Sequence, residues 1–272
     1  TSLFAASFLI TPLALAEDNI VIPDLGPAGI RGMTVQAEKN YGEFFMRKAN
    51  GAGAVTADPV LNEYIDTVGS KLIMNASNVY FPFEFFLSSD KSLNASAFLG
   101  GKVQVNAGLF HYTDNEDEFA SVLAHEISHV TQRHIARLIE AQTDRTPVSV
   151  ASIIGSIVVA LINPTVGMAA LSSSTGLLAQ AGINFTRDNE SEADRVGLSV
   201  LARAGYNPMA MSDLFKKLLA QQGNINPAFS MLVDHPLSEI RVAETYNLAK
   251  NMPKRQNSKN PNFMMAKARV DV

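Results

Sequence analysis

The segment His125-Glu126-Ile127-Ser128-His129 carries the clearest chemistry in this chain. Histidines at positions i and i+4 lie on one face of an α-helix, so their imidazoles can bind the same metal ion. Glu126 stands between them with its side chain off the metal face, where it can accept a proton from water. This HExxH arrangement is typical of zinc-assisted hydrolysis and predicts His125 and His129 as zinc ligands, with Glu126 as general base.

The residues before and within the motif predict that it lies in a helix. Thr113 and Glu116 have the spacing of a capping box, with Thr113 as the N-cap. Apolar residues then recur at helical spacing, namely Phe119, Val122, Leu123, Ile127 and Val130. The two histidines therefore fall in the middle of a predicted helix, as one shared metal ion requires.

A catalytic zinc needs a third protein ligand and one open position. The metzincin pattern would place a histidine at position 135, but this residue is Ile135. His134 falls about 140° around a continuous helix from His129. We therefore expect His134 at the surface or in a second layer around the site, and not as a ligand.

A later acidic segment supplies a better third ligand. Residues 189–194, Asn-Glu-Ser-Glu-Ala-Asp, begin a predicted helix that ends before Gly205. Glu190 and Asp194 share one face, whereas Glu192 points about 200° away from Glu190. We predict Glu190 as the ligand and Asp194 as the acceptor that fixes the tautomer of a ligating histidine. An ordinary charged helix face is the alternative, and it is what we expect of Glu192.

Three segments, 125–129, 189–194 and 235–241, resemble in order and spacing the gluzincin peptidases that include HtpX and the CAAX prenyl proteases. The family pattern is HExxH, a later ExxxD and an HPxxxxR segment. This resemblance implies an α+β fold, a mostly helical metallopeptidase domain with a small β-sheet before the HExxH helix. It also implies one zinc ion per chain, held by the predicted ligands, with the HExxH glutamate as catalytic carboxylate.

The resemblance adds His235 and Arg241 as catalytic residues. His235 precedes what reads as a Pro-initiated helix. It could donate to the developing oxyanion, or occupy the open zinc position and hold the enzyme latent. A structural role for the His-Pro turn is the third alternative.

The resemblance is nearest to periplasmic metalloproteases of Gram-negative bacteria that act in outer-membrane assembly. These proteins continue into C-terminal tetratricopeptide repeats. The implied partners are unfolded or misassembled protein substrates and, through the repeats, the outer-membrane assembly machinery. The net charge of -4, with scattered basic residues, predicts no nucleic-acid partner.

A small predicted sheet precedes the motif helix. Amphipathic patterns predict helices over 35–48 and 59–76, and strands are expected at 83–87, 94–98 and 102–106, the last two joined as a hairpin at Gly100-Gly101. An extended substrate can add to an open sheet edge. We therefore predict Asn94, Ala95 and Ala97 as the substrate edge strand, with a plain core hairpin as the alternative.

The chain ends carry further expectations. An apolar run closed by Ala14-Leu15-Ala16 predicts a signal peptide remnant over 1–16 and export to the periplasm, with a buried N-terminal helix as the alternative. The metallopeptidase domain is predicted over 17–253. Residues 254–272 are predicted as a linker and the start of a truncated repeat region. Cysteine is absent, which excludes a disulfide scaffold and a cysteine nucleophile.

Residues 146–186 contain no charged residue. Their longest clean apolar stretch, 148–162, is shorter than the roughly 20 residues that a membrane span needs. We expect two short apolar helices in a hairpin that can contact a membrane. A membrane-embedded protease of the HtpX type and a zinc-binding assembly chaperone with latent peptidase activity therefore remain alternatives, although a pure scaffold would not require Glu126.

Overall fold

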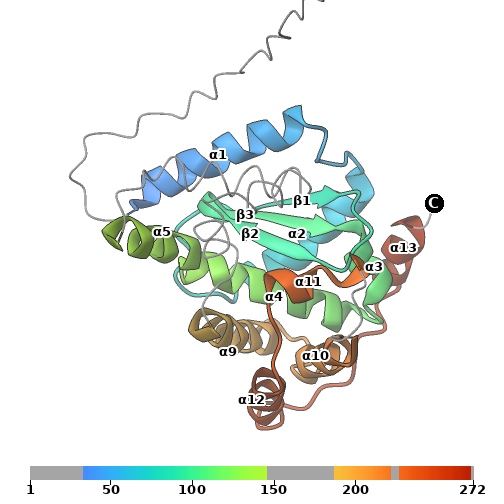
Figure 1. Ribbon diagram of the computed structural model, residues 1–272. Coiled ribbons are helices and arrows are strands. Elements are labelled where there is room, and N and C mark those ends of the chain that lie inside the picture. The colour runs from blue at the N-terminus through green and yellow to red at the C-terminus, as the bar shows by residue number, and fades with distance from the viewer. Residues whose placement is uncertain (1–32, 146–186, 222–226, 271–272) are drawn as a thin grey trace, which may run out of the picture.

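The computed structural model describes residues 33–145, 187–221 and 227–270. These residues form a mostly helical domain with one three-stranded sheet (Figure 1). The predicted α+β fold with a small sheet before the motif helix is confirmed. The predicted signal segment and the uncharged hairpin over 146–186 lie outside the described residues.

The sheet has the strand order β1-β3-β2. Its strands are β1 (Glu84–Ser88), β2 (Ala95–Phe98) and β3 (Lys102–Asn106), with β1 parallel and β2 antiparallel to β3. The predicted hairpin is confirmed, because a short 3-10 turn, Leu99–Gly101, joins β2 to β3. Both glycines of this turn have positive φ, 71° and 81°, which favours glycine there. The arrangement leaves β2 at one edge of the sheet.

Helices cover both faces of the sheet because successive side chains of a strand point to opposite faces. Phe86 in β1 packs with Phe44 and Phe45 of α1 (Val35–Gly51) in one apolar cluster. Its neighbours Phe85 and Leu87 belong to the larger cluster, which includes α2 (Pro59–Ile73). Figure 1 accordingly shows the sheet between α1 on one side and α2 with α4 on the other.

The motif helix α4 (Glu116–Thr131) follows the short helix α3 (Ala107–Tyr112), and all of its residues are buried. Its N-cap is Asn115, whose side chain accepts a hydrogen bond from the Glu118 amide. The predicted Thr113 cap is therefore wrong. The Thr113 hydroxyl instead donates to the Leu109 carbonyl and helps to end α3.

Further helices follow α4 in the described part of the chain. They are α5 (His134–Arg145), α9 (Arg187–Arg203), α10 (Met209–Gln221), the short α11 (Met231–Asp234), α12 (Glu239–Ala249) and α13 (Pro261–Val270), with a 3-10 turn at Pro227–Phe229. The helix expected to start with a proline after His235 begins instead with Ser238 as its N-cap. The side chain of Ser238 accepts from the Arg241 amide, which makes it the stronger start signal.

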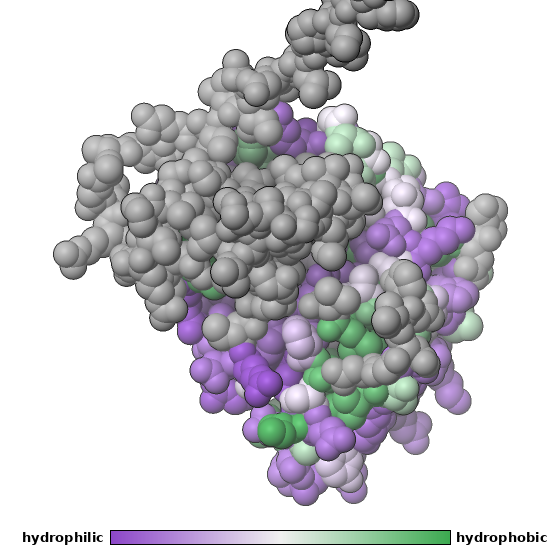
Figure 2. Space-filling model, in the orientation of Figure 1, coloured by the Kyte–Doolittle hydropathy of each residue, from purple (hydrophilic) through white to green (hydrophobic). Residues whose placement is uncertain are grey.

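Helix α13 packs against α2 and α3, and Phe263 is only 1% exposed in the main core. Phe263 and Ala266, beyond the predicted domain boundary at 253, thus belong to the described core, and the boundary itself stays a prediction. Within the described part of the chain, no helix is long and apolar enough to cross a membrane. Among the coloured atoms of Figure 2, hydrophilic side chains predominate, and hydrophobic side chains gather over α10 and α11.

Candidate metal centre

Helices α4 and α9 bring the predicted ligands together. His125 and His129 are each 1% exposed, and their Nε2 atoms lie 3.0 Å apart. Gly197 lets α9 approach α4 closely, since a Cβ at this position would lie only 3.0 Å from the Ala124 carbonyl oxygen. Glu190, at the start of α9, thereby reaches the two imidazoles.

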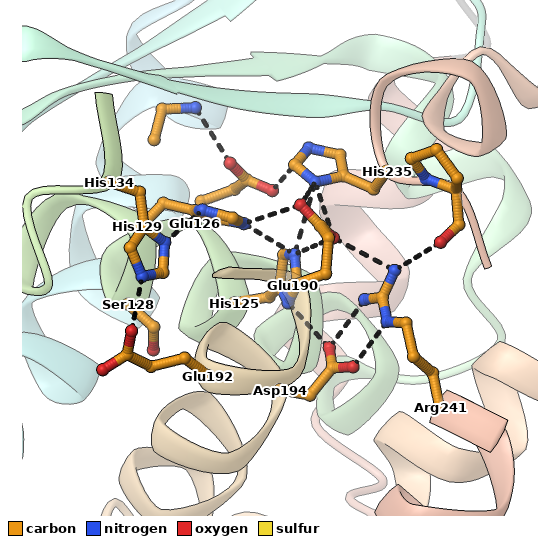
Figure 3. A network of polar contacts seen from close by, with 12 residues as sticks. His125, Glu126, Ser128, His129, His134, Glu190, Glu192, Asp194, His235 and Arg241 are labelled. Atoms are coloured by element: carbon orange, nitrogen blue, oxygen red, sulfur yellow. Dashed lines mark hydrogen bonds and ion pairs between the residues drawn. The ribbon is translucent and has the colours of Figure 1, made fainter. Parts of the chain in front are cut away.

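Four buried side chains converge on one point: His125, His129, Glu190 and His235 (Figure 3). Glu190 oxygens lie 3.5 Å and 3.6 Å from the Nε2 atoms of His125 and His129. Nδ1 of His235 lies 3.2 Å from both Glu190 oxygens and 3.4 Å from Nε2 of His125. Tetrahedral ligands about 2.0–2.2 Å from a zinc ion are about 3.3–3.6 Å apart. The four groups therefore have a spacing that can hold a metal ion.

A carboxylate and an arginine lie behind His125. Nδ1 of His125 is 3.0 Å from Asp194 Oδ1, and Arg241 donates to both Asp194 oxygens at 2.7 Å and 2.8 Å. Arg241 also lies 3.0 Å from Glu190 Oε2 and donates to the Pro236 carbonyl. Asp194 is thus placed where we predicted it, and Arg241 holds both acidic residues from the side away from Glu126.

His129 has its own second layer, in which a role for Glu192 was not predicted. Nδ1 of His134 lies 2.8 Å from Nδ1 of His129, and Nε2 of His134 lies 3.2 Å from Glu192 Oε2. His134 is fully buried, so of the two expected positions, at the surface or in a second layer, the structure excludes the surface. Glu192 is no ordinary surface charge either, because it also accepts a hydrogen bond from Arg137.

A break in the helix explains the missed contact. The angle of about 140° between His129 and His134 holds only for a continuous helix. Helix α4 ends at Thr131, and Arg133 adopts a left-handed backbone with φ 55°. Helix α5 then starts at His134, and this change of direction returns its ring toward His129. The close pair of histidines five residues apart was the only signal in the sequence.

Glu126 is buried beside the ligands without joining them. Its Oε2 accepts a hydrogen bond of 2.9 Å from the Ala97 amide of β2. Its Oε1 has no hydrogen-bond partner among the described residues and lies 3.5 Å from Nε2 of His235. A buried carboxylate oxygen with this freedom can accept a proton from a water molecule held at the site.

The predicted edge strand is present with one difference. Ala95 and Ala97 belong to β2, whereas Asn94 precedes the strand. The Asn94 side-chain amide donates to Asp234 at 2.6 Å. Asn94 therefore links the start of β2 to the short helix α11, just before His235.

Burial and neighbouring charges both shift the pKa values of the side chains at the site. Burial raises the pKa of Glu126, and burial with the neighbouring His125 lowers that of His129. Burial alone would also raise the pKa values of Glu190 and Asp194. Instead both are lowered, Glu190 mainly by His235 and Asp194 mainly by its contact with His125.

The pKa of His125 reflects the negative charge of the neighbouring carboxylates. Burial would lower its pKa, but hydrogen bonds with Asp194 and Glu190 raise the pKa to about 10. The ionised carboxylates thus draw a proton onto a buried imidazole. A metal cation supplies the same positive charge and would take the place of that proton, so the donor set and its charge both fit a metal ion.

An HExxH helix, joined by a glutamate from a later helix, defines a metallopeptidase of the gluzincin class. The chain belongs to peptidase family M48, whose family model matches residues 59–249. Over 250 residues it is 40% identical to the beta-barrel assembly-enhancing protease of Yersinia pestis, covering 92% of this chain and 51% of that protein.

Other relatives differ in how much of each chain is covered. The protein of the same name in Escherichia coli (strain K12) is 40% identical over 94% of this chain and 53% of its own length. The metalloprotease LoiP of the same strain is 28% identical over 69% of this chain and 71% of its own length. The chain thus spans about half the length of the first of these relatives.

Proposed function

We propose that this chain is the catalytic part of a zinc-dependent endopeptidase. The observation that supports this most is the buried group of His125, His129, Glu190 and His235, with the free carboxylate oxygen of Glu126 beside it. Two imidazoles and one carboxylate are the ligand set of many catalytic zinc sites. His125, His129 and Glu190 would hold one zinc ion per chain.

Glu126 would act as the general base and then as the acid. When bound, zinc lowers the pKa of a water molecule toward neutrality and polarises the scissile carbonyl. Glu126 takes the proton of the attacking water at Oε1 and later delivers it to the leaving amine. Its raised pKa suits both steps, because a carboxyl that ionises closer to neutral pH binds and releases a proton readily. The hydrogen bond from Ala97 fixes the orientation of the carboxylate.

The substrate would bind along β2, with Asn94, Ala95 and Ala97 as the segment first predicted. This strand lies at the sheet edge and contacts α4. A small pocket beside it has space for little more than a water molecule. Its lining residues are Glu38, Ala97, Phe98, Leu99, His129, Val130, Arg133 and Ile135. Because the Ala97 amide donates to Glu126, a substrate strand would pair with the main chain at this residue through the Ala97 carbonyl.

His235 would hold the enzyme latent as a fourth ligand. Its Nδ1 faces the same point as the other three ligands, where a catalytic site keeps its open position. His235→Ala should then raise the proteolytic rate of the full-length protein. A lower rate with zinc retained would favour the oxyanion role instead. Arg241 contacts the proposed ligand Glu190 and, behind the ligands, Asp194 and the Pro236 carbonyl, so we assign it a positioning role.

The biological role we propose is proteolysis in the periplasm during outer-membrane protein assembly. The name of the relatives, beta-barrel assembly-enhancing protease, supports this role, with unfolded or misassembled proteins as substrates. Release of the full-length protein with the periplasmic fraction, with the first residues removed, would support it. Recovery only in detergent with those residues retained would favour a membrane-embedded protease.

The activity itself is tested by exchanging the metal. The full-length protein should cleave casein, lose this activity with a chelator, and regain it with zinc but not with magnesium. Magnesium is the matched control because it prefers oxygen ligands in octahedral geometry. Zinc binding without any cleavage, also in His235→Ala, would favour the alternative of a zinc-binding assembly chaperone.

A further inference from the structure

We propose that His134 is a positioning residue for the metal ligand His129, and that Glu192 in turn holds His134. This inference rests on the proposed function, since it assumes that Nε2 of His129 binds a metal ion. The relay would run from the buried ligand to the protein surface. Figure 3 shows the three side chains in this order, one after another.

The tautomers of the two rings follow from the distances. Nε2 of His129 faces His125 and Glu190, so it must be free of a proton to bind the metal. The proton of His129 then sits on Nδ1, which lies 2.8 Å from Nδ1 of His134. Nδ1 of His134 must therefore accept, because a neutral imidazole has one donor and one acceptor nitrogen.

Glu192 completes this assignment. The proton of His134 is left on Nε2, which lies 3.2 Å from Glu192 Oε2 and can donate to it. Arg137 donates to the same oxygen at 2.9 Å and keeps the carboxylate in place. His129 thus donates to His134, and His134 donates to Glu192. Hydrogen bonds of this kind orient ligating histidines and raise their basicity.

The two histidine ligands then have parallel supports. Behind His125 stand Asp194 and Arg241, and behind His129 stand His134, Glu192 and Arg137. Helix α9 supplies the ligand Glu190 and a carboxylate for each support. All three acidic residues of the segment 189–194 would therefore serve the metal site.

A pair of near-isosteric variants separates positioning from simple space filling. In His134→Asn the amide oxygen can replace Nδ1 as acceptor, whereas His134→Leu fills the space without an acceptor. In the full-length protein, chelator competition should show that His134→Leu binds zinc about 10–100-fold more weakly, as losses of second-layer partners do. His134→Asn should stay within a few-fold of the unmodified protein. The visible spectrum of bound cobalt should shift in His134→Leu only.

Space filling predicts the reverse order, because Leu suits a buried position better than Asn. Equal zinc affinity in His134→Leu and the unmodified protein, or equal losses in both variants, would overturn the inference. If the unmodified protein binds no zinc, the proposed function fails instead.

If His134→Leu does not fold, the inference is tested at Glu192, the partly exposed end of the relay. Glu192→Ala should weaken zinc binding several-fold, while Glu192→Gln, which keeps an acceptor, should weaken it less. Asp188→Ala is the matched control, an exposed carboxylate of the same helix. An effect of Glu192→Ala no larger than that of Asp188→Ala would overturn the inference.

Discussion

At the scale of single residues, the site is a balance of buried charges. Glu190 and Asp194 are both nearly inaccessible, and their neighbours keep their pKa values low. Among the described residues, Arg241 supplies the one permanent positive charge in contact with both of them. A metal ion would supply the remaining positive charge. Substitution of a ligand and a change of pH should therefore both change the affinity for the metal.

The acidic residues of α9 should differ in their effect on zinc content. Glu190→Ala removes a ligand and should abolish retention of zinc after mild dialysis. Asp194→Ala should weaken binding about 10–100-fold, and Glu192→Ala should have the smallest effect of the three. Metal analysis of the dialysed proteins checks this order. Loss of zinc from Glu192→Ala with retention in Glu190→Ala would show that the ligand is assigned to the wrong glutamate.

Zinc binding should release protons. The pKa of His125 in the metal-free chain is raised to about 10, so this imidazole is protonated at pH 7 and must lose its proton to bind zinc. We expect at least about one proton released per zinc at pH 7, and an affinity that rises as the pH increases toward about 10. Titration calorimetry in buffers of different ionisation enthalpy measures the release. Binding without proton release would contradict the charge balance described for the site.

At the scale of elements, the site depends on how closely α9 packs against α4. The HExxH spacing and the shared face of Glu190 and Asp194 were predictable because both follow from the geometry of one helix. The helix break at Arg133 was not, since its left-handed backbone is stabilised by distant contacts with Met33 and Glu38. The parallel pairing of β1 with β3 could not be predicted from the sequence either, because it joins strands that are separated in sequence by β2.

Gly197→Ala should disturb this packing. The added Cβ would meet the backbone of α4 at Ala124 and His125. Overpacking of this kind costs about 1–3 kcal/mol in the free energy of unfolding, and zinc affinity should fall because α9 carries Glu190. Denaturant unfolding and chelator competition measure the two effects.

Gly51→Ala in α1 is the matched control for this substitution. A Cβ at Gly51 would meet nothing within 4 Å. This variant should gain up to about 1 kcal/mol, the usual helix preference for Ala over Gly. Equal effects of the two substitutions would contradict the role given to close packing.

At the scale of the whole molecule, the site joins segments that are far apart in the chain. The proposed ligands come from α4, from α9 and from His235 between α11 and α12. The apolar core beneath them extends from α2 to α13. A metal ion that ties these segments together stabilises only the folded chain.

Zinc should therefore raise the melting temperature of this domain. A zinc concentration about 100 times the dissociation constant adds about 2.7 kcal/mol, which corresponds to about 5–10 °C for a domain of this size. Calorimetry of the unmodified protein and Glu190→Ala, with zinc and with chelator, checks the shift. A shift of the same size in Glu190→Ala would place the stabilising ion elsewhere.

Glu126→Gln separates metal binding from catalysis at one residue. Zinc content and casein cleavage are measured together in the full-length protein, with Glu63→Gln, an exposed residue of α2, as the matched control. We predict that Glu126→Gln keeps stoichiometric zinc while cleavage falls by at least about a hundredfold, the range for loss of a general base. Glu63→Gln should change neither quantity. Undiminished cleavage by Glu126→Gln would contradict the account.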